Sequence, residues 1–102
     1  MKTLKVKPGV CGMETTIIAE NGEDGITIKI DSPCPAVNQM ISSLDQPIEP
    51  YSVCFSKPGT GQIYEAANQL SHGACPMPAA IIKCIEAEAM LALPRDVEMH
   101  FE

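Results

Sequence analysis

The sequence predicts an α+β domain: a mainly antiparallel four-stranded sheet with helices packed on one face, in the order β-β-β-α-α-α-β. Three observations predict this fold class. Apolar and polar residues alternate near both ends of the chain, apolar residues recur at helical spacing in its second half, and strand-like and helix-like segments are segregated. The 102 residues, 45% of them apolar, suffice for one core, so residues 1–102 are expected to form a single domain.

Four segments are expected to form strands: 3–7, 14–20, 26–31 and 96–101. In the first, third and last of these, apolar and polar residues alternate, which gives a strand one apolar face. The second is rich in β-branched residues, which favour strands. Residues 21–25 separate the second and third strands with the Asn, Gly and Asp typical of a hairpin turn.

Three helices are expected between the third strand and the last. One begins at Pro35, a second follows Thr60 as its cap, and the longest runs from Pro76 towards Pro94. The segment 51–55 lies among prolines, and the sequence leaves open whether it is a short strand or a helical turn. Because only four residues are aromatic, the core should be aliphatic. Six isoleucines and valines are expected in it: Ile28, Ile30, Val37, Ile41, Ile81 and Ile85.

Two cysteines share an unusual setting, because Cys34 and Cys75 each stand directly before a proline at an expected helix start. The free N–H groups and the dipole at a helix N-terminus favour the thiolate over the thiol. Cys11 lies beside a glycine in the connector between the first two strands. Cys84 falls within the longest helix beside its apolar face, so it is expected to be a small core residue.

These positions raise the hypothesis of a metal site. The hairpin topology places Cys11 and Cys34 at the same end of the sheet, and Cys75 joins them if the long helix starts there, with His72 three residues upstream. Three thiolates and an imidazole suit zinc or an iron–sulfur cluster. The spacings match no standard metal motif. Two alternatives therefore stay open: a structural or protein-interaction module with inert thiols, including a homodimer, and a thiol redox protein.

Composition limits the partners and the compartment. The net charge of −6 leaves no basic face for a nucleic acid or an anionic membrane surface. No apolar run approaches the length of a membrane span, and no signal-peptide pattern is visible, so a cytoplasmic protein is expected. Glu88, near the end of the long helix, is expected to lean out to water. The sequence contains no Ser/His/Asp arrangement and no carboxylate pair with acid–base spacing, so it assigns no enzyme reaction.

Four segments, 10–17, 32–35, 72–78 and 91–94, together resemble a family of small uncharacterised proteins of anaerobic bacteria and methanogens. The resemblance covers nearly the whole chain and implies no activity, although an anaerobic setting would suit an oxygen-sensitive thiol or cluster. More distantly, Cys75-Pro76 resembles the cysteine-rich domain named for its Thr-Ser-Cys-Pro-Asp motif, for which metal binding has been suggested. Only the Cys-Pro pair is shared.

Overall fold

Three strands form one antiparallel sheet in the computed structural model, which describes residues 1–102. The strands are β1 (Lys2–Val6), β2 (Thr15–Gly22) and β3 (Gly25–Asp31), adjacent in chain order. Leu4 of β1 lies opposite Ile17 of β2, which in turn lies opposite Ile30 of β3. This register gathers the alternating apolar residues on one face, as the sequence pattern predicts.

The hairpin between β2 and β3 turns through Glu23 and Asp24, with Gly22 paired to Gly25. Gly25 has a φ of 140°, and a Cβ there would lie 2.5 Å from the carbonyl oxygen of Ile48. Ile48 approaches this closely because it exchanges two backbone hydrogen bonds with Ile26, each 2.8 Å long. The outer edge of β3 is therefore partly closed by the segment that follows α1.

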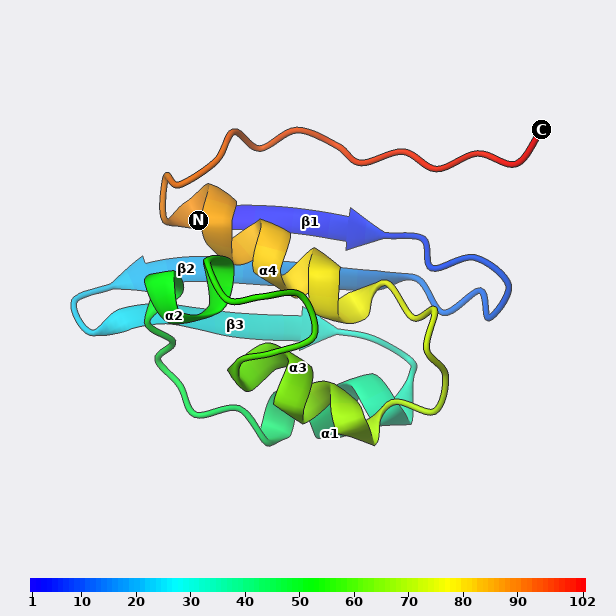
Figure 1. Cartoon of the computed structure of the whole chain (residues 1–102), viewed down its shortest axis with the longest axis horizontal. Coiled ribbons are helices and arrows are strands. Elements are labelled where there is room, and N and C mark those ends of the chain that lie inside the picture. The colour runs from blue at the N-terminus through cyan, green and yellow to red at the C-terminus, as the bar shows by residue number, and fades with distance from the viewer.

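All helices follow β3 in the chain. They are α1 (Pro35–Ser42), α2 (Pro50–Cys54), α3 (Gln62–Ala66), a 3₁₀ turn η1 (Ala67–Gln69) and α4 (Met77–Glu88). Figure 1 shows α4 lying in front of the sheet, with α1 and α3 beside the β3 edge. The opposite face of the sheet carries the half-buried or exposed side chains of Thr16, Ile18 and Lys29. The fold is thus a two-layer α+β arrangement with one uncovered sheet face.

Two expectations about element order are wrong. The sheet has three strands rather than four, because the segment 96–101 is extended but makes no strand pairing. The chain of regular elements therefore ends in α4, and the order β-β-β-α-α-α-β does not hold. The segment 51–55 is helical rather than a strand: residues 51–54 belong to α2, and Phe55 follows it. The carboxylate of Glu49 caps this helix by accepting hydrogen bonds from the N–H groups of Tyr51 and Ser52. Gly61 rather than Thr60 precedes α3.

The core is aliphatic, as composition predicts. None of the four aromatic side chains belongs to it, and it is built mainly from isoleucine, methionine, valine and alanine. Of the six residues expected there, four are buried: Ile28, Val37, Ile81 and Ile85. Ile30 and Ile41 are half-buried at its margin. No helix in the structure combines the length and the apolar character that crossing a membrane requires.

Candidate functional site

Three connectors that carry cysteines lie at one end of the sheet. Figure 1 shows the β1–β2 connector, the turn from β3 into α1 and the segment before α4 at the same right-hand end. These are the connectors that contain Cys11, Cys34 and Cys75, respectively. The topological expectation for the three connectors is therefore met, and the question becomes whether the side chains converge.

Cys34 occupies the position predicted for it, at the N-cap of α1. Its backbone is extended (φ −82°, ψ 115°), and its carbonyl oxygen accepts the first helical hydrogen bond from Asn38, 3.1 Å long. Its own N–H donates to the Ser32 hydroxyl at 3.2 Å, and that hydroxyl also accepts from Thr15 of β2 at 2.8 Å. This network fastens the start of α1 to the end of the sheet and leaves the Cys34 thiol half-buried against the core.

Cys75 lies one position further from its helix than the sequence predicts. The N-cap of α4 is Pro76, and the proline within the first turn is Pro78. Proline fits both positions, because the N–H groups at the start of a helix have no partner within the helix. Cys75 is half-buried against the core, whereas His72 is exposed on the same connector. Both residues line a shallow hollow of about 350 Å³ beside Tyr64.

The metal hypothesis finds no support in this arrangement. No three His, Cys, Asp or Glu side chains in the structure are grouped closely enough to hold one ion. Cys11 is exposed, whereas Cys34 and Cys75 pack against the core, so the shared end of the sheet does not bring these thiols and His72 into one ligand set. A common connector end is set by topology, but a metal site also needs converging side chains.

Cys84 is the core residue that the sequence predicts. It is 3% exposed, and its Sγ lies 3.6 Å from the carbonyl oxygen of Lys2 and 3.8 Å from that of Ile17. Burial raises the pKa of the Cys84 thiol, and the charge of Glu88 adds to this rise. The residue therefore joins α4 to β1 and β2 as a neutral thiol.

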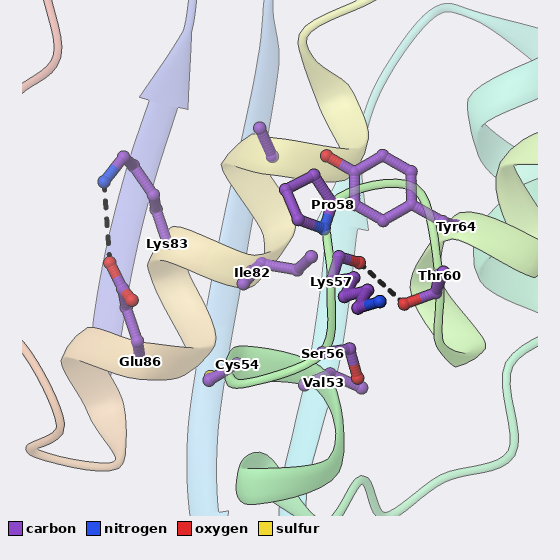
Figure 2. Close-up of a pocket in the computed structure, with 11 residues that line it drawn as sticks. Val53, Cys54, Ser56, Lys57, Pro58, Thr60, Tyr64, Ile82, Lys83 and Glu86 are labelled. Carbon is purple, nitrogen blue, oxygen red and sulfur yellow. Dashed lines mark hydrogen bonds and ion pairs between the residues drawn. The ribbon is translucent and has the colours of Figure 1, made fainter.

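Cys54, for which no sequence pattern predicts a role, lines a second hollow of about 220 Å³. Figure 2 shows this hollow between the loop that carries Lys57 and Thr60 and the side of α4. On α4, the ammonium of Lys83 lies 3.5 Å from the carboxylate of Glu86. Burial raises the pKa of the Cys54 thiol to about 11, with smaller contributions from the charges of Glu86 and Glu49. No local sequence pattern signals this rise in pKa, because it depends on how the loop packs on α4, and the two acids are distant in sequence.

The expectation that the Glu88 side chain is exposed to water is wrong. Its carboxylate accepts a hydrogen bond from the backbone N–H of Asn21 at 3.0 Å and lies 3.1 Å from the ammonium of Met1. The side chain is only 9% exposed. The hydrogen bond with Asn21 is the main cause that lowers the pKa of this carboxyl. This contact forms at the hairpin end of the sheet, away from the cysteine connectors.

Several large apolar side chains lie on the surface. In the segment 95–102, Val97 is 59% exposed, Met99 is 86% exposed and Phe101 is fully exposed. Tyr51 lies on α2 and Phe55 directly follows this helix; their rings lie 5.8 Å apart and both are exposed. Both phenylalanines of the chain are therefore outside the core. The alternating pattern predicts a strand for the first set, whereas no sequence pattern indicates that Tyr51 and Phe55 lie on the surface.

The comparisons with known proteins give one match. Residues 2–101 match a family described as a family of unknown function (DUF6951). No curated protein and no solved structure matches the chain. The match agrees with the resemblance to uncharacterised proteins, while an occurrence in anaerobic bacteria and methanogens stays a prediction.

Proposed function

The chain belongs to this family of unknown function, and we propose that it is a protein-interaction module that associates with a second copy of itself. The observation that carries this proposal is the segment 95–102, which is exposed throughout and presents Val97, Met99 and Phe101 to water. Removing one such side chain from water contributes about 1.5–3 kcal/mol. Aromatic residues and methionine are also enriched at protein interfaces.

Two of the five thiols are poorly suited to nucleophilic or redox chemistry. Burial raises the pKa values of Cys54 and Cys84, so both stay neutral at physiological pH. We also propose a cytoplasmic location, which the five free cysteines support because thiols stay reduced there. A metal site formed by Cys11, Cys34, Cys75 and His72 is not part of the proposal, because these residues form no common ligand set.

Sedimentation velocity of the full chain across a concentration series tests the proposal. We expect a reversible monomer–dimer equilibrium, with the dimer fraction rising with concentration. Met99→Ser together with Phe101→Ser should weaken the association by about tenfold or more, because the buried apolar area is lost. A chain that stays monomeric at every concentration would overturn the proposal.

Two matched variants locate the interface. Val10 is a fully exposed apolar residue in the β1–β2 connector, so Val10→Ser should leave the dimerisation constant unchanged. Phe55→Ser removes the other exposed phenylalanine, at the end of α2. If Phe55→Ser dissociates the dimer while the variants of segment 95–102 do not, the interface lies on α2 and the proposed segment is wrong.

A further inference from the structure

The two edges of the sheet differ in how they are closed. On the β3 side, Ile26 exchanges two hydrogen bonds with Ile48, and the N–H of Ile28 donates to the Gln46 side chain at 2.7 Å. On the other side, β1 pairs only with β2, and no backbone group bonds to its outer edge. Every second residue of such an edge strand directs its N–H and C=O away from the sheet, where another strand can pair with them.

The segment 95–102 matches this open edge on both of its faces. In β1, half-buried Leu4 and Val6 face the helical layer, while Lys5 and the adjacent Lys7 are exposed. In the segment, Val97, Met99 and Phe101 alternate with Glu98, His100 and Glu102, and Asp96 precedes them. Set beside β1, its apolar residues would extend the apolar face, and its acidic residues would meet the lysines.

Lysines on a free edge ordinarily discourage pairing with other chains. Here they also select the partner, because only an acidic strand compensates their charge. Two of the seven basic residues of the chain, Lys5 and Lys7, lie at this edge, and in the segment 95–102 three carboxylate side chains outnumber the one guanidinium, that of Arg95. A chain with net charge −6 has few other places where an acidic segment would be attracted.

On these grounds we infer that the segment 95–102 of one copy adds as a strand to the outer edge of β1 in a second copy. This inference rests on the proposed self-association and names its contact surface. Exchange of both segments gives a two-fold arrangement in which each copy supplies one segment and one edge. The exposed apolar residues would then be covered, and the edge of β1 closed.

The direction of the chain favours a second copy over the same chain. Glu88 at the end of α4 contacts Met1, so the segment leaves the helix beside the start of β1. Its direct path along the edge of its own β1 would be parallel to that strand, and Figure 1 shows it free of the helix–sheet body. A segment from a second copy is free to run antiparallel, which gives the slightly more stable pairing.

Charge reversal in the full chain tests the inference. Lys5→Glu and Glu98→Lys should each weaken dimerisation by about tenfold, because each places like charges across the new strand pair. The double variant Lys5→Glu/Glu98→Lys should regain most of the wild-type affinity. Lys29→Glu is the matched control, because Lys29 is exposed on the same sheet face but lies on β3. It should leave the affinity unchanged.

Hydrogen exchange of the β1 amides separates the outcomes. We expect their protection to rise with protein concentration, in step with dimer formation. A dimer that forms without added protection of β1, or that Lys29→Glu weakens as much as Lys5→Glu, overturns the inference and leaves the proposed self-association standing. If the β1 amides of a monomer are protected to the same extent at every concentration, the segment pairs within its own chain, and the inference is overturned too. The absence of any dimer rejects the proposed function itself.

Discussion

The carboxylate of Glu88 and the backbone N–H of Asn21 are joined by a hydrogen bond of 3.0 Å, although 67 residues separate them in sequence. Glu88 is the last residue of α4, and Asn21 lies near the end of β2. The bond therefore fixes the end of the helix to the hairpin end of the sheet. The carboxylate also lies 3.1 Å from the ammonium of Met1, so one side chain holds three parts of the fold together.

Replacing Glu88 with Gln should destabilise the protein in a pH-dependent way. The hydrogen bond with Asn21 and the nearby ammonium lower the pKa of Glu88 in the folded state. A lowered carboxyl pKa adds stability above the pKa of the unfolded state, and this stability is lost as pH falls through the folded value. At neutral pH, urea unfolding should show a loss of about 1 kcal/mol, since glutamine still accepts a hydrogen bond but carries no charge.

The difference between wild type and Glu88→Gln should shrink as the pH is lowered from about 6 to about 3. Glu23→Gln, which removes one charge from the exposed hairpin loop, is the control and should show no such trend. A difference that stays constant over this range would mean that the charge of Glu88 contributes nothing.

Replacing Gly25 with Ala should cost about 2–4 kcal/mol in the free energy of unfolding. The φ of 140° disfavours any L side chain, and the new Cβ would lie 2.5 Å from the carbonyl oxygen of Ile48. That oxygen accepts a hydrogen bond from Ile26, so it cannot move without breaking the bridge to β3. Gly73→Ala is the matched control, because a Cβ there meets nothing within 4 Å. Equal effects of the two changes in urea titrations would contradict this account.

Local patterns predicted the three strands and the hairpin, because each depends on neighbouring residues. The alternation around Ile28 and the turn residues from Asn21 to Gly25 are sufficient to define β3 and its connection. The alternation of Val97, Met99 and Phe101 is as regular, but a strand also needs a partner with a free edge. The outer edge of β1 is free, yet the segment 96–101 does not pair with it in this chain. Alternation shows that a segment can form a strand but not which edge it pairs with, so the fourth strand of the sheet was predicted wrongly.

In the candidate site, too, local sequence patterns predict some features, whereas others depend on how distant segments pack. Proline placement correctly predicted that Cys34 directly precedes α1, and the apolar helix pattern correctly predicted the burial of Cys84. The hydrogen bond between Glu88 and Asn21 depends on how α4 packs on the sheet, which no local pattern specifies. Likewise, topology predicts that three cysteine connectors share one end of the sheet, but not whether their thiols converge.

The thiols should differ in their rates of alkylation in the folded protein. Cys34, at the start of α1, and Cys75, just before α4, are half-buried, whereas Cys84 is only 3% exposed. At neutral pH, iodoacetamide should modify Cys34 and Cys75 at least about tenfold faster than Cys84, since Cys84 reacts only when the core opens. Mass-resolved peptide analysis over time measures the rates. In guanidinium chloride all three should react alike, and equal rates in the folded state would contradict the burial of Cys84.

Cys54 should become reactive only at strongly alkaline pH. It is half-buried, and burial together with the charges of Glu86 and Glu49 raises its pKa to about 11, from an ordinary value of 9.0. Because the thiolate is the species that reacts, the alkylation rate of Cys54 should rise with a midpoint near that value.

Glu86→Gln should lower the midpoint, since it removes one negative charge and leaves the Lys83 ammonium unpaired beside the same hollow. Glu65→Gln, which changes an exposed carboxylate on α3, should leave it in place. Circular dichroism at each pH confirms that the chain stays folded, and a midpoint near 9.0 in the folded protein would show that the hollow does not shield the thiol.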